Sequence, residues 1–268
     1  MIITKLQGGL ANQIFQWAYG KFLSDHNKTP LYLDVSFYLN QFGVTKREFS
    51  LNKFPNLDYN ILPNDRNINN WSIEPGKTKI IGITDNHNYS KLDYQPDAHY
   101  YLNGYWQSEK YFKGIENIIR ENLKPSEEKL KELKDKYDTN NSVSIHIRRT
   151  DYVTSNGYHP VQPIEYYQKG LDLIKDYDRV LVFSDDIEWC KNNLDFKNMV
   201  FVEGNDDVED LWLMSLCGHN IIANSSFSWW GAWLNENKNK KIITPEKWFG
   251  DKSNTNYSDI IPENWIKI

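Results

Sequence analysis

Between residues 143 and 244, short apolar segments alternate with longer segments whose apolar residues recur at helical spacing. The short segments are four to six residues long and apolar on both faces, like the strands of a parallel sheet that helices cover on both sides. The alternation predicts a doubly wound, Rossmann-like domain, because parallel strands need a crossover connection between them. The expected strands are residues 143–148, 179–184, 199–202, 220–223 and 241–244, and the expected helices are residues 164–175, 187–193, 208–217 and 227–235.

The first half of the chain is less regular. Residues 37–97 are rich in Asn, Asp, Pro and Tyr and predict loops with one clear strand, residues 79–83. Pro125 precedes a helical pattern and predicts a domain boundary, which gives an N-terminal α/β domain at residues 1–125 and a C-terminal domain at residues 126–268. The other expected strands are residues 1–7, 31–35 and 99–106, and the other expected helices are residues 12–25, 108–121 and 126–137.

Charge and apolar patterning exclude several classes of protein. The 268 residues carry a formal net charge of −5, which argues against a broadly basic nucleic-acid surface. No apolar run approaches the roughly 20 residues that span a bilayer, and residues 1–5 enter a strand pattern at once, which leaves no signal peptide. Cys190 and Cys217 lack the spacing of a metal site, so we expect buried free thiols in a reducing compartment, the cytoplasm.

The expected strand at residues 143–148 ends in a pair of arginines. Arg148 and Arg149 are followed closely by Asp151 and Tyr152. Open α/β sheets bind ligands at the carboxyl ends of their strands, and guanidinium groups match phosphate oxygens in geometry and charge. The pair therefore predicts a phosphate or diphosphate site. The simpler alternative is an ion pair between Arg149 and Asp151 on a surface loop.

Two later strand ends also carry polar residues. Asp185 and Asp186 are carboxylates that can accept hydrogen bonds from a base or a ribose. Ser225, Ser226 and Phe227 come where a strand gives way to a helix, so their hydroxyl and N–H groups meet the positive end of that helix. This arrangement predicts a second phosphate contact, although helix capping by either serine explains part of it.

A glycine pair lies between the first expected strand and the first expected helix. Gly8 and Gly9 precede Asn12 and Gln13. Backbone N–H groups at such a helix start bind anions and polar ligands. Tight turns of this kind also need glycine for backbone reasons alone, and Asn12 and Gln13 suit helix capping equally well, so the pattern by itself leaves both interpretations open.

Three segments resemble motifs of one enzyme family. Residues 146–152, HIRRTDY, resemble the HxRRxDY motif of the α-1,2-fucosyltransferases that use GDP-fucose, glycosyltransferase family 11. Residues 8–16, GGLANQIFQ, resemble that family's GGLGNQMFQ start, with Ala11 in place of a usual glycine. Residues 224–234, NSSFSWWGAWL, are similar to its late block. The segments span nearly the whole chain in the family's order, and together they are specific.

The resemblance implies a GT-B-like α/β fold, with two Rossmann-like domains, a cleft between them, and the more regular parallel sheet in the C-terminal domain. It implies an inverting transfer of L-fucose from GDP-β-L-fucose to the 2-hydroxyl of a terminal galactose, on an oligosaccharide or a lipid-linked glycan. Like bacterial members, the chain shows no membrane anchor, which implies a cytoplasmic protein that is at most peripheral to the cytoplasmic membrane. Residues 37–97 match no motif of the family, so the acceptor stays open.

The resemblance also assigns roles to individual residues. Arg148 is expected to bridge the β-phosphate and the glycosidic oxygen, and Asn12 to reach across the cleft towards the fucose or Arg148. Asp185 is expected to face the nucleoside. Ser225, Ser226 and Phe227 are expected to hold the diphosphate, and the other substrate-binding residues in the motifs are Gly8, Gly9, Gln13 and Arg149.

The charge of the leaving diphosphate must be stabilised in the transition state, by a metal ion or by fixed cations. The acid pairs at residues 185–186 and 206–207 lack the spacing of a metal-binding DxD motif. The second pair suits the start of a solvated helix better. Because Arg148 and Arg149 are available, we expect no metal and no other cofactor.

Inversion by a single displacement calls for a group that takes the proton from the acceptor hydroxyl. Asp151 and His146 are the motif residues able to do so. We place Asp151 first, while noting that it can equally orient Arg149 and that a histidine inside a strand is more often structural. A loose transition state would need no strong base.

Aromatic residues make up 15% of the chain, including 10 tryptophans, and rings suit sugar faces as well as cores. We expect Trp229, Trp230 and Trp233 to pack a helix against the sheet rather than to stack on a sugar. A non-catalytic carbohydrate-binding protein would explain the rings but not the paired arginines. A sugar-nucleotide hydrolase would show a clearer base or metal cluster, and transfer of another nucleotide-linked sugar on the same fold stays an alternative.

Overall fold

The computed structural model describes residues 1–42, 45–63, 78–82, 88–96, 98–155, 157–253 and 255–268. The chain forms two compact units. The first contains Met1–Lys124 and Asn256–Pro262, and the second contains Pro125–Thr255 and Glu263–Ile268. The chain thus enters the second unit at Pro125, returns to the first unit for the short segment Asn256–Pro262, and ends in the second unit. Within the described ranges, no helix has the length and apolarity that crossing a membrane requires.

The first unit is built on a five-stranded sheet with the order β3-β2-β1-β5-β4, and every pair of neighbours is parallel. The strands are β1 (Ile2–Lys5), β2 (Leu31–Asp34), β3 (Asn60–Ile61), β4 (Thr78–Gly82) and β5 (His99–Asn103). The chain runs outward from β1 in one direction and returns on its other side. The carboxyl ends of β1 and β5 therefore form a topological switch point, where open α/β sheets bind ligands.

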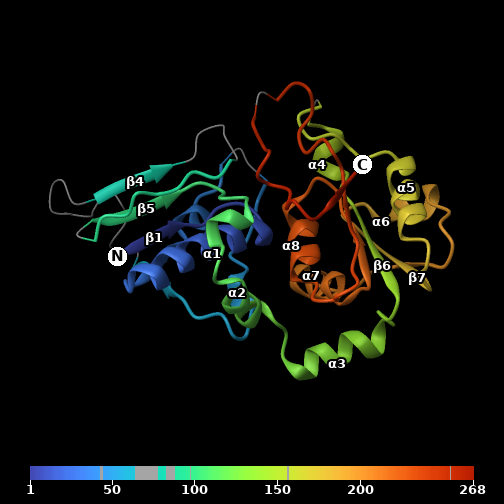
Figure 1. Cartoon of the computed structure of the whole chain (residues 1–268), viewed down its shortest axis with the longest axis horizontal. Helices are drawn as coiled ribbons and strands as arrows, with labels where there is room; N and C mark the ends of the chain where they lie inside the picture. The colour runs from blue at the N-terminus through green and yellow to red at the C-terminus, as the bar shows by residue number, and fades with distance from the viewer. Residues whose placement is uncertain (43–44, 64–77, 83–87, 97, 156, 254) are drawn as a thin grey trace. The chain divides into compact units, whose positions relative to one another are not determined.

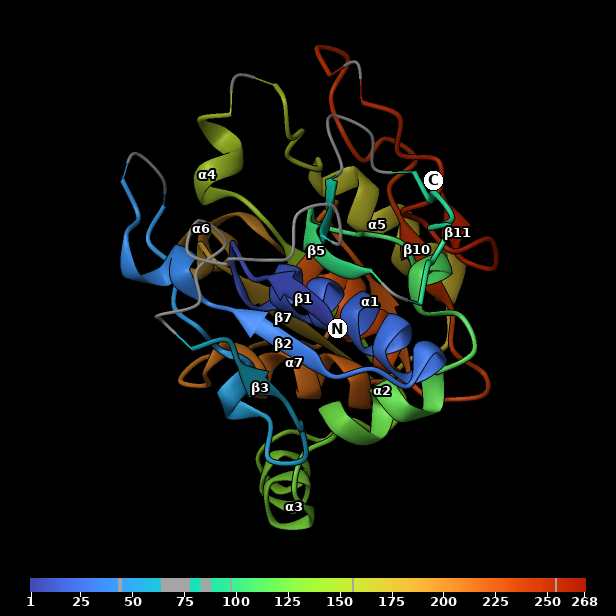
Figure 2. The same cartoon turned by 90° about the vertical axis from the view of Figure 1, so that its left-hand side faces the viewer.

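Helix α1 (Leu10–Asn27) follows β1 and packs beside β1 and β2 (Figure 2). Apolar side chains cover most of its length, and the helix crosses the sheet closely at Gly20. A Cβ atom on Gly20 would lie 2.3 Å from the hydroxyl of Thr4, which is far inside contact distance. Glycine at this position therefore sets how near α1 approaches the sheet that carries the site.

The helix expected at residues 108–121 is interrupted. A 3₁₀ helix, η4 (Glu109–Phe112), is followed by a separate helix, α2 (Glu116–Leu123). The break falls at Gly114, whose φ of +101° lies outside the helical range. Ser108 caps η4, as expected for the longer helix, by accepting a hydrogen bond from the Lys110 N–H. Two further 3₁₀ helices are η1 (Ser36–Leu39) and η2 (Leu51–Lys53).

The second unit confirms the predicted parallel sheet and extends it. Its order is β11-β10-β9-β6-β7-β8, which is the order of a Rossmann sheet counted from β6. The strands are β6 (Ser142–Ile147), β7 (Arg179–Ser184), β8 (Met199–Phe201), β9 (His219–Ile221), β10 (Ile242–Thr244) and β11 (Ile266–Lys267). Strand β11 was not expected, because two exposed residues leave no strand pattern. The switch point lies between β6 and β9.

Helices cover both faces of this sheet (Figure 1). Leu171 of α5 packs in one apolar cluster with Val180 and Val182 of β7, whereas Leu181 packs in another cluster with Leu213 of α7. This alternation along β7 is what a strand buried on both faces produces. The helices are α3 (Glu127–Lys136), α4 (Thr150–Val153), α5 (Ile164–Ile174), α6 (Ile187–Asn193), α7 (Asp207–Leu216) and α8 (Ser226–Leu234). The four-residue α4 was not expected.

Two expectations about buried side chains are confirmed in this unit. Trp229, Trp230 and Trp233 on α8 are at most 5% exposed and pack against one another, so they belong to the core. Cys190 and Cys217 are buried free thiols.

Candidate active site

The arginine pair lies at the switch point of the second unit, directly after β6. Arg148 is held between two carboxylates: its Nη2 atom is 2.7 Å from Oδ1 of Asp151, and its Nη1 atom is 3.3 Å from Oδ2 of Asp185. The ring of Tyr152 lies 5.5 Å from its guanidinium carbon. The Arg148 side chain remains 20% exposed. The guanidinium is therefore oriented by the protein and still accessible to a ligand.

Arg149 has a different set of partners. Its Nε donates to Oδ2 of Asp186 at 3.1 Å, and its guanidinium carbon lies 3.7 Å from the centre of the Trp189 ring. The suggestion that Asp151 pairs with Arg149 is therefore wrong, because Asp151 pairs with Arg148. Trp189 lies on α6, so stacking fixes the plane of the Arg149 guanidinium in a way that a lysine could not reproduce.

Asp185 connects the arginine segment to the neighbouring strand end. Its Oδ1 accepts the Arg149 backbone N–H at 2.9 Å, and its Oδ2 accepts the Thr150 hydroxyl. Burial raises the pKa of Asp185, but the hydrogen bond from Thr150 and the charge of Arg148 lower it more, so its pKa lies below the ordinary value. Asp185 is therefore a charged residue that positions the arginines. Its expected contact with a nucleoside stays a prediction.

The start of α8 forms the other side of this site. Ser225 is the N-cap, and its hydroxyl accepts the Phe227 N–H at 3.4 Å. Ser226 is the first residue of the helix. The capping interpretation is thus correct for Ser225. It is compatible with an anion at the same place, because the other N–H groups of the first turn have no partner within the helix.

Tyr152 fastens the arginine segment to this helix start. Its hydroxyl donates to the backbone carbonyl of Asn224 at 2.8 Å. The Asn224 side chain is buried, donates to the Trp248 carbonyl at 2.9 Å and accepts from Gln162 at 3.1 Å. Two strand ends distant in sequence are thereby held as one rigid group, with arginines on one side and a helix N-terminus on the other.

His146 is enclosed rather than presented to a substrate. Its side chain is 4% exposed, and its ring lies 5.6 Å from that of Phe227. Burial, and then the charge of Arg148, hold the pKa of His146 well below its ordinary value, so the ring is neutral. This position argues against His146 as the proton acceptor. Asp151, whose side chain is 46% exposed, is the better placed of the two candidates.

The first unit has its own group of polar residues at the switch point beside β1. Gly8 has a φ of +79°, and a Cβ atom there would lie 2.7 Å from Nδ2 of Asn12, so both backbone and space require glycine. The helix N-cap is Gly9, which places Asn12 inside the first turn rather than at the cap. Oδ1 of Asn12 accepts a hydrogen bond from Nε2 of Gln107 at 2.8 Å, so the amide of Asn12 has a fixed orientation.

Gln13 is a structural residue, contrary to the expectation that it binds substrate. It is fully buried. Its Nε2 donates to the carbonyls of Gly8 and Glu48, and its Oε1 accepts the Ser50 N–H at 2.9 Å. Both ends of the amide are therefore occupied, and Gln13 ties the glycine turn to the segment around residue 48.

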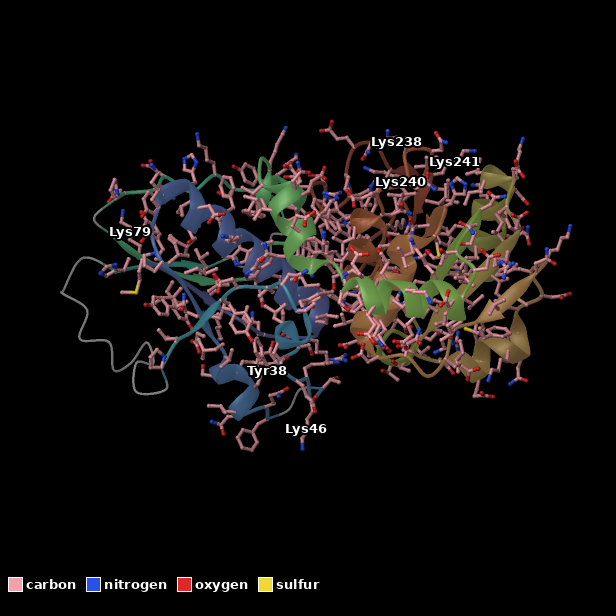
Figure 3. All side chains as sticks on the ribbon, turned by 90° about the horizontal axis from the view of Figure 1, so that it is seen from below. Tyr38, Lys46, Lys79, Lys238, Lys240 and Lys241 are labelled. Carbon is pink, nitrogen blue, oxygen red and sulfur yellow. The ribbon has the colours of Figure 1, made fainter. Side chains whose placement is uncertain are left out.

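Several residues beside these groups were not identified from the sequence. Tyr38, which is labelled in Figure 3, lies in the first unit. Its hydroxyl donates to the Gly8 carbonyl at 3.1 Å. The side chain of Arg47 lies 3.9 Å from where a Cβ atom on Gly9 would be, and its guanidinium forms no ion pair with a described residue. Arg47 and Gln107 lie in loops and Tyr38 lies in the short 3₁₀ helix η1, none of which shows a periodic apolar pattern. Only the fold shows that they adjoin the glycine turn.

The acidic segment at residues 206–210 has a structural role. Asp206 caps α7 through the N–H groups of Val208 and Glu209, and the Glu209 side chain accepts the Asp206 N–H in return, which completes a capping box. Among the described residues, no group of three or more His, Cys, Asp or Glu side chains is arranged to hold a metal ion. The expectation of a metal-free reaction stays a prediction.

Comparison with known proteins gives concordant results. The model of the family described as Glycosyl transferase family 11 matches residues 1–268. An α-1,2-colitosyltransferase of Escherichia coli is 36% identical and covers 100% of this chain and 99% of its own length. The O-antigen biosynthesis glycosyltransferase WbnK of the same species is 32% identical, with coverage of 98% and 99%. The crystal structure of NodZ α-1,6-fucosyltransferase soaked with GDP-fucose covers 87% of this chain and 91% of its own, with a TM-score of 0.53 and 13% identity. This structural likeness confirms the GT-B-like fold class.

Proposed function

Because this chain belongs to glycosyltransferase family 11, we propose that it transfers L-fucose from GDP-β-L-fucose to the 2-hydroxyl of a terminal galactose, with inversion at the sugar carbon. The observation that supports this proposal most directly is the orientation of Arg148 between Asp151 and Asp185, beside the start of α8. An oriented guanidinium therefore lies at the carboxyl end of a central strand, beside a helix N-terminus, and both groups suit the phosphates of a nucleoside diphosphate. The choice of fucose rests on the three motifs that resemble the fucosyltransferases of this family.

In this proposal, the diphosphate lies between the arginine segment and the α8 N-terminus. The N–H groups of the first turn after Ser225 donate hydrogen bonds to phosphate oxygens. The Arg148 guanidinium faces the oxygen that links phosphate to fucose. As the bond from the fucose C1 to that oxygen breaks, negative charge grows on the leaving diphosphate. A fixed guanidinium stabilises this charge without rearranging, because Asp151 and Asp185 already hold it in place.

The new bond forms between the acceptor 2-hydroxyl oxygen and the fucose C1, on the face opposite the departing GDP. The hydroxyl proton goes to a base, for which we propose the exposed carboxylate of Asp151. Its Oδ1 accepts from Arg148 at 2.7 Å, so Oδ2 is the oxygen available for the proton. Asn12, oriented by Gln107, is proposed to contact the fucose, as its place in the family's glycine-rich motif implies.

The acceptor is proposed to be a galactose-terminated oligosaccharide or a lipid-linked glycan. The name of WbnK places that relative in O-antigen biosynthesis, and it is similar to this chain over nearly the full length of both. The terminal galactose itself comes from the resemblance to the motifs of the galactoside-specific members.

A second donor has a specific observation in its favour. The relative that is 36% identical is named as an α-1,2-colitosyltransferase. Colitose has the carbon skeleton of L-fucose without the 3-hydroxyl, so one pocket can accept both sugars unless a polar group contacts that hydroxyl. A buried polar partner for the 3-hydroxyl would reject colitose strongly, because it would be left unpaired.

The test is a donor competition in EDTA. The purified protein receives a terminal β-galactoside with GDP-fucose, GDP-colitose or UDP-galactose, and the products are separated and their linkage assigned by NMR. We expect α-1,2-linked fucose as the main product. Transfer of colitose alone would replace the proposed donor, and transfer from neither GDP sugar would overturn the proposal.

A further inference from the structure

A pocket of about 510 Å³ lies in the first unit, along the second half of α1. Ligand sites in proteins commonly have volumes of about 300 to 1,000 Å³. None of the residues around this pocket belongs to the motifs that carry the proposed function. Those that matter below are Tyr19, Phe22, His26, Tyr89, Lys91 and Tyr94.

The walls present flat rings. Phe22 and His26 stack on each other on one face of α1, with centroids 5.8 Å apart and planes 13° from parallel. Tyr94 stacks on Tyr100 at 5.0 Å, so its ring is also held flat. Tyr89 is 39% exposed, so part of its ring is accessible to a ligand. Such rings match the apolar C–H faces of pyranose sugars.

The same pocket contains polar groups that a purely apolar ligand would leave unpaired. Tyr19 is only 3% exposed, yet its hydroxyl forms no hydrogen bond with any residue that the structure describes. Burial raises the pKa of Tyr19, so the hydroxyl keeps its proton and remains a donor. Lys91 and Asp93 add a cation and a carboxylate to the lining. Rings with hydrogen-bonding groups at their edges favour a carbohydrate over a lipid chain.

The returning segment Asn256–Pro262 holds one wall of the pocket in place. Asp259 accepts the Tyr89 N–H at 2.9 Å and pairs with Lys110 at 2.5 Å, and the Ser258 hydroxyl is 3.2 Å from the Asn88 side-chain oxygen. The ring of Tyr89 also packs edge-on against Tyr111 at 5.0 Å. The pocket is therefore formed before a ligand arrives, which reduces the entropic cost of binding.

The pocket lies on the same side of α1 as the site residue Asn12. Residues 12, 19 and 26 are spaced by seven, so successive members lie two helical turns apart and drift by only about 20° around the axis. Tyr19 is thus about 10 Å, and His26 about 20 Å, from Asn12 along the helix. The ring of Trp106 packs against that of Tyr19, with centroids 4.8 Å apart, and Trp106 is next in sequence to Gln107, which orients Asn12.

We propose that this pocket is a glycan subsite, which binds a sugar of the acceptor located beyond the galactose that receives fucose. The inference rests on the proposed function, because it takes the acceptor's reacting end to lie near Asn12. It predicts that the enzyme selects longer acceptors, and that the rings of the pocket, rather than the donor site, set this preference.

The test compares kcat/KM for methyl β-galactoside with that for lacto-N-tetraose and lacto-N-neotetraose, in wild type and Tyr89→Ala. Loss of one stacking ring is expected to lower kcat/KM for a tetrasaccharide about fivefold or more, and to leave that for the monosaccharide unchanged. Ile118→Ala, which removes a side chain of matched exposure on α2, should change neither. Wild type that shows no preference for length, or a Tyr89→Ala variant that loses both activities equally, would overturn the proposal.

A binding measurement without donor separates this inference from the proposed function. Saturation-transfer NMR reports contact between a tetrasaccharide and the protein whether or not transfer occurs. Binding that Tyr89→Ala abolishes, together with no transfer from GDP-fucose, would support the subsite and reject the donor. Transfer of fucose without any effect of Tyr89→Ala on tetrasaccharide binding or turnover would reject the subsite and keep the donor.

Discussion

Nη1 of Arg148 lies 3.3 Å from Oδ2 of Asp185, which joins the ends of two adjacent parallel strands, β6 and β7. Asp185 also accepts the Arg149 N–H, so one carboxylate fixes both the side chain of one arginine and the backbone of the next. A cation that is already oriented when the substrate binds stabilises developing charge without reorganisation. The proposed transfer of fucose depends on this arrangement.

Replacing Arg148 by alanine should remove the stabilisation of the leaving diphosphate. We expect kcat to fall by about 100-fold to 1,000-fold, the range seen when one transition-state donor is deleted. Arg148→Lys should restore little of the lost kcat, because an ammonium group cannot pair with both carboxylates in the fixed geometry of the guanidinium. The control is Arg179→Ala, which removes an ion pair of similar length with Asp138 and should leave kcat unchanged. Equal turnover in Arg148→Ala and the control would contradict the assignment.

Gln107 should act through Asn12. Gln107→Leu removes the donor that fixes Oδ1 of Asn12, so we expect kcat to fall about tenfold or more while the Kd for GDP stays unchanged. Gln168→Leu on α5 removes an exposed glutamine that also donates to one side chain, and serves as the matched control. A parallel loss in Kd and kcat, or no effect on either, would show that Gln107 does not position a reacting group.

The hydroxyl of Tyr152 should support both stability and donor binding. Tyr152→Phe keeps the ring and removes the hydrogen bond to the Asn224 carbonyl, which we expect to cost about 1 kcal/mol in the free energy of unfolding. The same change loosens the connection between the arginine segment and α8, so GDP should bind more weakly. Denaturant titration and calorimetry measure the two effects. Loss of stability with an unchanged Kd for GDP would limit Tyr152 to a structural role.

His146 should make the free energy of unfolding depend on pH. Its pKa in the folded protein is held below the ordinary 6.5 by burial and by Arg148. Below about pH 6.5 the unfolded chain binds a proton that the folded protein does not, so stability falls as pH falls through this range and is fully present above it. Protonation of His146 in the unfolded chain lowers the equilibrium constant for folding by at most about tenfold for each pH unit within this range. Denaturation between pH 7 and 5 should show a weaker pH dependence in His146→Gln; an unchanged slope would contradict this.

Much of the second unit was predictable because its strands are buried on both faces. Every expected strand and helix between residues 143 and 244 is present, since crossover connections and continuous apolar runs leave few other folds. The helix expected at residues 108–121 is broken at Gly114. The break follows from the positive φ of this glycine, which the spacing of apolar residues does not reveal. The short elements α4 and β11 carry too few residues for a periodic pattern to appear.

The sequence singled out the residues that gather at these strand ends but not the pairs that they form. Arg148 and Arg149 were singled out because guanidinium groups suited to phosphate follow a strand end, and Asp185 because a carboxylate that can accept from a nucleoside follows the next strand. Their partners could not be identified, because Asp151 is within reach of both arginines in sequence and only the fold joins it to Arg148. For Gln13 the sequence suggested a contact with substrate, and the structure shows a buried residue instead. It belongs to a motif, yet the fold buries it and uses both ends of its amide.

The most direct test of the central claim is calorimetric titration of GDP into the wild-type protein and Arg148→Ala, in EDTA, with UDP as control. We predict micromolar binding of GDP to the wild type, a loss of at least tenfold in Arg148→Ala, and no comparable binding of UDP. Absence of GDP binding, or binding that returns only when Mn²⁺ or Mg²⁺ is added, would contradict a donor site in which arginine takes the place of a metal.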